Sequence, residues 1–318
     1  MSAVEVDRAA LLALLPEASV GIVQSIEPIR AGLSGAGVYA IAATGGAFVL
    51  RVQARQLDES YFAQQLRVLR RASDAGIAPP IVHVDEAARA VVSLRIVGRP
   101  LGAALADPAE RPAALGSVID GLRTLHGLDA SGVAPRDPLP QLRREWQACL
   151  ARQGLPSWLP TLEPTLAELS SVLASDPRRS VSHNDVNPGN FLWDGARAWL
   201  VDWEFAGLGH PYYDLASLAL FLRLDDEVAL ALVARHDGAP LDAAARDTFR
   251  ALRRLVGLLT GFTFFGLVDD LRVRPAESLA DAPSLGDCYA AMRAGTFDLQ
   301  SQLGRASMGL ALLASAVR

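Results

Sequence analysis

Residues 182–204 read SHNDVNPGNFLWDGARAWLVDWE and stand apart from the helical pattern on either side of them. Two short apolar runs, Asn190–Trp193 and Ala198–Val201, flank Asp194-Gly195, which is a strong turn signal. This order of strand, turn and strand is typical of a β-hairpin. We therefore predict one hairpin inside a half of the chain that is otherwise helical.

The open end of the predicted hairpin has side chains suited to a metal ion and to proton transfer. Asn190 and Asp202 are expected to face each other there, and amide and carboxylate oxygens suit Mg²⁺. Asp185 lies five residues before Asn190, where it could accept a proton from an attacking hydroxyl group. Pro188-Gly189 turns the chain between these roles. For any single residue, an ordinary polar hairpin with capping side chains is the alternative; the ordered set favours the reactive site.

The composition is that of a globular protein large enough for about two domains. Of 318 residues, 51% are hydrophobic and 20% charged, which excludes a wholly disordered chain. The net charge of −5 argues against a broadly basic nucleic-acid-binding surface. The apolar runs Leu255–Val268 and Met308–Val317 are shorter than the roughly 18 residues of a spanning helix. With no basic leader and only two cysteines, we expect a cytoplasmic protein without nucleic-acid or membrane partners.

The chain divides at Gly98-Arg99-Pro100 into a small β-rich part and a larger helical part. The first part is expected to contain helices at Asp7–Leu15 and Tyr61–Ala72 and strands at Ile22–Ile29, Val38–Ala42, Ala47–Val52, Ile81–Val84 and Ala90–Ile96. In the second part, helices are expected at Leu115–Leu125, Leu142–Leu150, Leu162–Leu173, Asp214–Leu222, Asp226–Arg235, Ala243–Leu271 and Cys288–Ala314. The predicted domains are residues 1–97 and 98–318, with a crevice between them that suits a small ligand.

The run from His183 to Asn190, followed by Leu200-Val-Asp-Trp-Glu204, resembles the aminoglycoside phosphotransferase and choline/ethanolamine kinase superfamily. It looks closest to the bacterial choline kinase-like and thiamine kinase-like members. The resemblance implies an α+β, protein-kinase-like bilobal fold, with a small antiparallel sheet and one main helix followed by a mostly helical lobe that contains the catalytic hairpin. It also implies an ATP- and magnesium-dependent kinase that phosphorylates a hydroxyl group of a small molecule.

The resemblance assigns roles to the polar residues of the motif. Asp185 would be the catalytic base, and His183 would support the catalytic loop. Asn190 and Asp202 would bind magnesium, and Asn190 thereby counts among the catalytic residues as well. Asp214 matches a family aspartate that braces the loop; its alternative role is that of a helix N-cap.

The first hundred residues supply the implied nucleotide site. The glycine-rich run Gly32–Gly37 lies between two strand signals, where backbone N–H groups could bind phosphates, although an ordinary hairpin loop has the same pattern. All 30 basic residues are arginine, and Arg51 falls where kinases contact the α- and β-phosphates; an exposed arginine on an edge strand is the alternative. The implied nucleotide-binding residues are Ser34, Gly35, Ala36, Gly37, Arg51 and Ile96.

The helix of the first part departs from the kinase pattern. A glutamate is expected there to pair with the cation on the strand, but this sequence has Gln64 or Gln65 at that place. Asp58 and Glu59 are the nearest acids. Three possibilities follow: one of these acids pairs with Arg51, or a neutral amide side chain holds Arg51, or the nucleotide site is impaired. The last option motivates a non-catalytic, nucleotide-binding pseudokinase as a competing hypothesis.

The acceptor is expected near Asp185 in the helical part. After Asp202 the chain has 14 acidic and 11 basic residues, which disfavours polycationic aminoglycosides. A quaternary ammonium group suits an aromatic cage with one carboxylate, and the candidate acceptor-binding residues are Asp185, Glu204, Trp203 and Tyr213, with Tyr212 and Phe262 as further aromatic candidates. Choline or ethanolamine is favoured by the resemblance. Thiamine, a sugar or an aminoglycoside stays open as the acceptor, as do a metal-dependent phosphohydrolase activity and the oligomeric state.

Overall fold

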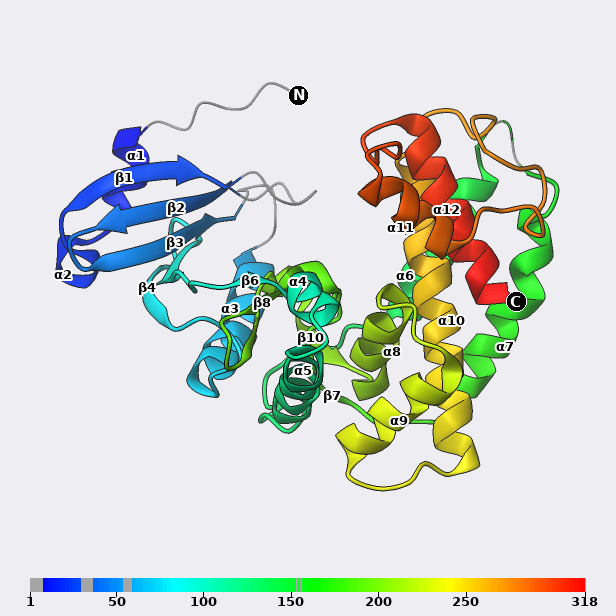
Figure 1. Cartoon of the computed structure of the whole chain (residues 1–318), viewed down its shortest axis with the longest axis horizontal. Coiled ribbons are helices and arrows are strands. Elements are labelled where there is room, and N and C mark those ends of the chain that lie inside the picture. The colour runs from blue at the N-terminus through cyan, green and yellow to red at the C-terminus, as the bar shows by residue number, and fades with distance from the viewer. Residues whose placement is uncertain (1–7, 30–36, 54–58, 153, 155, 318) are drawn as a thin grey trace. The chain divides into compact units, whose positions relative to one another are not determined.

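The computed structural model describes residues 8–29, 37–53, 59–152, 154 and 156–317. Contacts divide the chain into two compact units, which Figure 1 colours by residue number. Unit 1 consists of Met1–Ala134 and Pro188–Gly207, and unit 2 consists of Pro135–Asn187 and Leu208–Arg318. The motif at residues 182–204 therefore contributes to both units. This division differs from the predicted domain boundary after residue 97, which stays a prediction.

The main sheet of unit 1 is antiparallel, with the strand order β1-β2-β3-β5-β4. Its strands are β1 (Val23–Pro28), β2 (Gly37–Ala43), β3 (Gly46–Val52), β4 (Ile81–Asp85) and β5 (Ala90–Leu94). Ile41 of β2 and Leu50 of β3 are fully buried in a core that also contains Leu11 of α1 (Arg8–Ala13) and Val20 of α2 (Glu17–Val20). The predicted small antiparallel sheet is thus confirmed.

The rest of unit 1 supports the hairpin. Helix α3 (Glu59–Asp74) packs on the main sheet through Phe62 and Leu66, which contact Val91. A second sheet has the order β6-β8-β9, formed by β6 (Arg99–Pro100), β8 (Phe191–Trp193) and β9 (Ala198–Leu200), and it contacts α4 (Leu101–Ala106) and α5 (Arg111–His126). The hairpin is thus present as predicted, with each of its two strands one residue shorter. The sequence pattern did not predict α4, a six-residue helix that follows Pro100.

Unit 2 is helical and is built around α10 (Ala243–Gly266). This helix contacts α6 (Pro138–Leu150), α7 (Glu163–Ala174), α8 (Pro211–Phe221) and α12 (Gln302–Val317), several of which surround it in Figure 1. A Cβ at Gly261 of α10 would lie 3.1 Å from the carbonyl oxygen of Gly309, so glycine permits the close approach of α10 and α12. The other elements are η1 (Leu159–Leu162), β7 (Ser180–Ser182), η2 (Pro188–Asn190), η3 (Trp203–Phe205), β10 (Gly207–Gly209), α9 (Asp226–Asp237) and α11 (Leu285–Arg293).

Most predicted helices differ from the structure by a few residues at their ends, and two differ more. The helix predicted over Cys288–Ala314 is two helices, α11 and α12, because Gly295 adopts a φ of +71° and ends the first of them. Ser284 and Asp287 form a capping box that starts α11 earlier than predicted. The helix predicted to run to Leu271 ends at Gly266. Apolar periodicity continued across both helix ends and concealed them.

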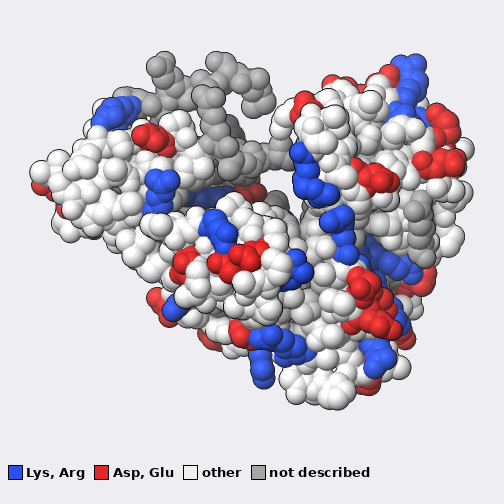
Figure 2. All heavy atoms as spheres, in the orientation of Figure 1, with Lys and Arg blue, Asp and Glu red and all other residues white. Residues whose placement is uncertain are grey.

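The surface view shows how charge is distributed over the described residues. Acidic and basic side chains are interspersed on the face of each unit in Figure 2. No helix in the described part of the chain is both long and apolar enough to cross a membrane.

Candidate active site

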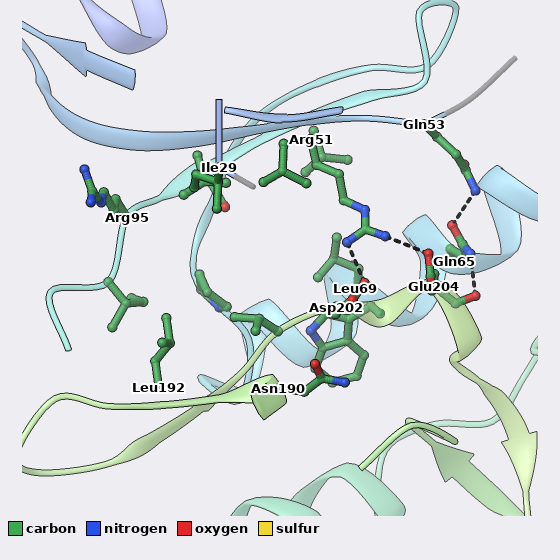
Figure 3. A pocket seen from close by; sticks show the side chains of 18 of the residues that line it. Ile29, Arg51, Gln53, Gln65, Leu69, Arg95, Asn190, Leu192, Asp202 and Glu204 are labelled. Atoms are coloured by element: carbon green, nitrogen blue, oxygen red, sulfur yellow. Dashed lines mark hydrogen bonds and ion pairs between the residues drawn. The ribbon is translucent and has the colours of Figure 1, made fainter. Parts of the chain in front are cut away.

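Unit 1 contains a cavity of about 630 Å³. Most of its wall is apolar and comes from the main sheet, α3 and the hairpin; these residues include Ile29, Val38, Val49, Leu69, Val91, Leu94, Ile96, Leu192 and Val201. In one part of the wall Arg51 extends toward Asp202 and Glu204, with Asn190 close by, whereas Arg95 lies apart from this group (Figure 3). The cavity therefore combines an apolar wall with a polar end, as small-molecule sites do.

Arg51 lies on β3 and bridges two carboxylates. Its Nη1 donates to Oδ1 of Asp202 over 2.6 Å, and its Nη2 donates to Oε2 of Glu204 over 3.0 Å. All three side chains are partly buried, with 22–30% of their surface exposed. Ion pairs of this kind are charge-assisted hydrogen bonds and hold a guanidinium in one orientation. Arg51 is thus a fixed cation on the wall of the cavity, which excludes the alternative of an exposed edge-strand arginine.

Backbone pairing sets the positions of Asn190 and Asp202. Phe191 pairs with Leu200, and the N–H of Val201 donates to the carbonyl oxygen of Asn190 over 2.9 Å. Asp202 follows directly, with φ +66° and ψ +62°, the left-handed region that aspartate tolerates better than most residues. This conformation ends the strand and begins the turn η3. The two predicted metal ligands thus both line the cavity.

Gln64 and Gln65 lie on α3 where a glutamate was expected, and the side chain of Glu59, the first residue of this helix, is outside the described part of the chain. Among the described side chains, the partners of Arg51 are Asp202 and Glu204. Gln65 donates from Nε2 to the carbonyl oxygen of Glu204 and accepts from Nε2 of Gln53 over 3.0 Å. The hydroxyl of Tyr61 donates to the same carbonyl oxygen over 2.6 Å. A neutral amide therefore holds the turn, whereas the side chains of Glu204 and Asp202 hold Arg51. Nothing in one sequence pointed to this pairing, because 151 or more residues separate the partners.

Two candidate acceptor residues, Glu204 and Trp203, line the cavity of unit 1. Glu204 pairs with Arg51, as described above. Trp203 is 6% exposed, and its Nε1 donates to the carbonyl oxygen of Leu200 over 3.0 Å. Both residues belong to unit 1, whereas Asp185 belongs to unit 2. The left-handed turn at Asp202 redirects the chain, and the sequence pattern gave no sign of that turn.

The predicted catalytic loop, residues 183–187 of unit 2, is held at its start by one buried carboxylate. Asp214 of α8 is fully buried and accepts from the backbone N–H of His183 over 2.8 Å and from that of Asn184 over 2.7 Å. Asn184 has φ +61°, so the chain turns sharply at the point where it is held. The N-cap of α8 is His210, whose Nδ1 accepts from the N–H of Tyr212 over 3.1 Å. Asp214 therefore braces the loop, and it is not the helix N-cap.

Asp185 and Tyr213 lie in the same electrostatic neighbourhood of unit 2. Burial raises the pKa of the Tyr213 hydroxyl, and the negative charges of Asp185 and Asp214 raise this pKa further. His183, two residues before Asp185, is fully buried, which suits a residue that supports the loop. Tyr213, a candidate acceptor residue, is thus close enough to the predicted base for the charge of Asp185 to act on it.

The structure describes only some of the other residues that were predicted to bind the nucleotide. Ile96 lines the cavity, and Gly37 begins β2 opposite Val52 of β3. Ser34, Gly35 and Ala36 lie outside the described residues. The role of the glycine-rich run therefore stays a prediction.

The donor set at the polar end fits a hard divalent cation. Asn190 and Asp202 offer oxygen atoms, the ligands that Mg²⁺ prefers. Among the residues that the structure describes, no group of three or more histidine, cysteine or acidic side chains could hold a metal ion.

Several solved structures of kinases and phosphotransferases have a fold similar to that of this chain. A crystal structure of a choline/ethanolamine kinase family protein from Mesorhizobium loti is 21% identical with a TM-score of 0.69, covering 97% of each chain. Choline kinase LicA from Streptococcus pneumoniae is 17% identical, with a TM-score of 0.60 over 82% of this chain and 90% of that one. An aminoglycoside phosphotransferase from Streptomyces rimosus, in complex with ADP and streptomycin, is 21% identical, with a TM-score of 0.53 over 79% of this chain and 99% of that one.

Sequence similarity is local in one case and extensive in another. Protein LicA of Haemophilus influenzae is 38% identical over 47 residues, which cover 15% of this chain and only 18% of that protein. The model of the phosphotransferase enzyme family, by contrast, matches residues 25–255, a span that includes the main sheet, the hairpin and the catalytic loop. The chain therefore belongs to the phosphotransferase enzyme family.

Proposed function

We propose that the protein transfers the γ-phosphate of ATP to a hydroxyl group of a small molecule. The observation that carries this proposal is the cavity of unit 1, whose apolar wall ends at a guanidinium, an amide oxygen and two carboxylates. A nucleotide has the matching polarity, with an apolar purine at one end and phosphates at the other. Membership of the phosphotransferase family supports the same reaction class.

Arg51 is the proposed phosphate-binding cation. The two carboxylates fix its guanidinium at the cavity wall, so it loses little side-chain entropy when it binds a phosphate. The purine would lie against the apolar wall near Ile96, and the run Ser34–Gly37 would bind phosphate oxygens through its N–H groups. The Streptomyces rimosus relative was crystallised with ADP, which supports a nucleotide as the ligand.

Asn190 and Asp202 are the proposed ligands of Mg²⁺. When bound, the ion would neutralise charge on the phosphate oxygens during transfer. Asp202 can serve as a ligand without rearrangement of the hairpin, because backbone hydrogen bonds and not its own side chain hold the strands together.

Asp185 is the proposed base. The acceptor oxygen would attack the γ-phosphorus while the bond from that phosphorus to the β,γ-bridging oxygen breaks, and the hydroxyl proton would pass to the Asp185 carboxylate. His183, which is buried, would keep the loop in place. Asp185 and Asn190 are only five residues apart in the chain, which supports their joint action.

The proposed acceptor is choline or ethanolamine. The likeness to a choline/ethanolamine kinase family protein supports this choice, and the aromatic ring of Tyr213 near Asp185 suits a cationic head group. A pseudokinase is less favoured than the sequence suggested, because Arg51 has two carboxylate partners despite the missing helix glutamate. Cys149 and Cys288 are both free and buried, which supports a reducing compartment, and we infer the cytoplasm.

An ATP-consumption screen over choline, ethanolamine, thiamine, sugars and aminoglycosides tests the proposal. We expect turnover with choline or ethanolamine, a fall of about 10²–10⁴-fold in Asp185→Asn, and unchanged ADP affinity in that variant. Asp247→Asn is the matched control, because Asp247 is an exposed aspartate on another helix of unit 2. ADP binding without turnover for any acceptor would indicate a pseudokinase. Phosphate release from a phosphoester without ATP would indicate a hydrolase.

A further inference from the structure

We propose that Glu204 is the positioning residue for Arg51 and that it keeps this arginine available to the nucleotide's phosphates. The inference rests on the proposed function of the cavity in unit 1 and goes beyond it, because Glu204 was expected to contact the acceptor. Its carboxylate is the second partner of Arg51, at 3.0 Å, beside the 2.6 Å pair with Asp202.

The Arg51 guanidinium donates one hydrogen bond to each of two carboxylates, those of Asp202 and Glu204. Arginine has five N–H donors, and within the described part of the chain two of them are used, one for each carboxylate. The other three remain for a ligand. If the charge of Glu204 is removed, Asp202 is the strongest partner left, and arginine readily pairs with a single carboxylate through two parallel hydrogen bonds. Arg51 would then turn toward Asp202, away from phosphate, and would compete with Mg²⁺ for the same carboxylate.

The main chain of Glu204 is held independently of its side chain. Tyr61 and Gln65 of α3 both donate to its carbonyl oxygen. Gln65 is in turn fixed by Gln53, which is 8% exposed. Replacing the side chain of Glu204 with its amide therefore removes the charge while leaving these three contacts in place. Helix α3 therefore affects Arg51 indirectly. The neutral side chains of Tyr61 and Gln65 hold the turn η3, and η3 contains Glu204, the partner of Arg51.

Calorimetric titrations of ADP and of adenosine, both without Mg²⁺, separate this role from a structural one. Glu204→Gln should weaken ADP binding by about 10-fold, the worth of one charged hydrogen bond, and leave adenosine binding within about 2-fold. In the Arg51→Gln background the same change should add nothing, because the two residues act as one unit. Glu86→Gln is the matched control, since Glu86 pairs with Arg70 at the exposed surface of the same unit.

Each result decides one question. A wild-type protein that does not bind ADP would contradict the proposed function of the cavity. If it binds ADP, then unchanged or tighter ADP binding by Glu204→Gln, or an equal loss for ADP and adenosine, would overturn the positioning role. Should Glu204→Gln fail to fold, Glu204→Asp retains the charge and the main-chain contacts, and it should keep ADP binding within about 3-fold of wild type. A larger loss selective for ADP in Glu204→Asp would count against the proposal, because the charge would still be present.

Discussion

The hairpin and the catalytic loop adjoin in the sequence but are stabilised in different ways. In the hairpin, backbone pairs join Phe191–Trp193 to Ala198–Leu200, and further backbone bonds join it to β6 and to Ile77. In the catalytic loop, two backbone N–H groups depend on the side chain of one residue, Asp214. In the hairpin, many backbone hydrogen bonds share in holding each residue in place, so no single side chain is essential. In the loop, one substitution at Asp214 removes both hydrogen bonds that hold the backbone.

The largest effect should come from removing that carboxylate. Asp214→Ala leaves the N–H groups of His183 and Asn184 without their acceptor beside a fully buried site, and we expect a loss of about 2–5 kcal/mol in the free energy of unfolding. Urea denaturation measures it. Asp194→Ala is the matched variant in the hairpin, since Asp194 also accepts from two backbone N–H groups, of Ala196 and Arg197, and from Nε1 of Trp199, but at an exposed turn. It should cost less than about 1 kcal/mol. Equal losses would contradict the comparison.

Acid should weaken unit 2 through His210, the N-cap of the helix that carries Asp214. Burial lowers the pKa of His210 to about 4, although Asp176 acts in the opposite direction. Because the folded state disfavours the protonated form, this contribution is complete above the unfolded pKa of about 6.5 and disappears as the pH falls toward 4. Over this pH range, His210 should lower the free energy of unfolding by about 3 kcal/mol in total.

The matched variant for this effect is His210→Asn, which retains a good N-cap but does not titrate. Urea denaturation between pH 7.5 and pH 4.5 should show wild-type stability falling more steeply than that of the variant. Parallel profiles would show that His210 is not the acid-sensitive group.

A change in the hairpin turn should cost stability without affecting the cavity. Gly195 has φ +97°, and nothing lies within 4 Å of a Cβ placed there, so Gly195→Ala introduces backbone strain alone. We expect a loss of about 1–2 kcal/mol in unfolding free energy and unchanged ADP affinity. Weaker ADP binding would show that the turn, and not the ladder, positions Asn190 and Asp202.

The smallest effect should come from an exposed ion pair. Arg250 pairs with Asp226 at 2.6 Å, but the two side chains are 48% and 45% exposed. Arg250→Ala should therefore lower the free energy of unfolding by less than about 1 kcal/mol, and the difference should shrink at high salt. A larger loss that salt does not reduce would mean that packing of the arginine stem, and not charge, stabilises this part of unit 2.

The local parts of the fold could be read from the sequence. Alternating apolar residues and turn signals identified the main sheet and the hairpin, because strand pairing between neighbours is encoded within a few residues of the turn. The order His183 to Asn190 followed by Asp202 identified the family, which the family match confirms. The end of α11 at Gly295 was missed, because an apolar pattern does not record a left-handed residue.

The tertiary contacts of the site could not be read in the same way. Arg51 meets Asp202 and Glu204 across 151 and 153 residues, and no local pattern encodes such a pair. The left-handed backbone of Asp202 redirects the residues that follow, so Glu204 and Trp203 line the cavity of unit 1. The chemistry of individual side chains suggested which residues belong to a binding site, but it did not indicate which of these side chains contact one another.

The left-handed backbone of Asp202 also limits how this family member can diverge. Glycine, asparagine and aspartate adopt that conformation at little cost, and of these only aspartate carries a charge. Asparagine would keep the shape of the turn and an oxygen atom, but it would remove the negative charge that serves both Arg51 and the proposed metal ion. A duplicated gene that drifted by this one substitution would encode a protein with the same turn and a weaker metal site, and asparagine at this position is therefore the mark by which descendants of reduced activity should be recognised.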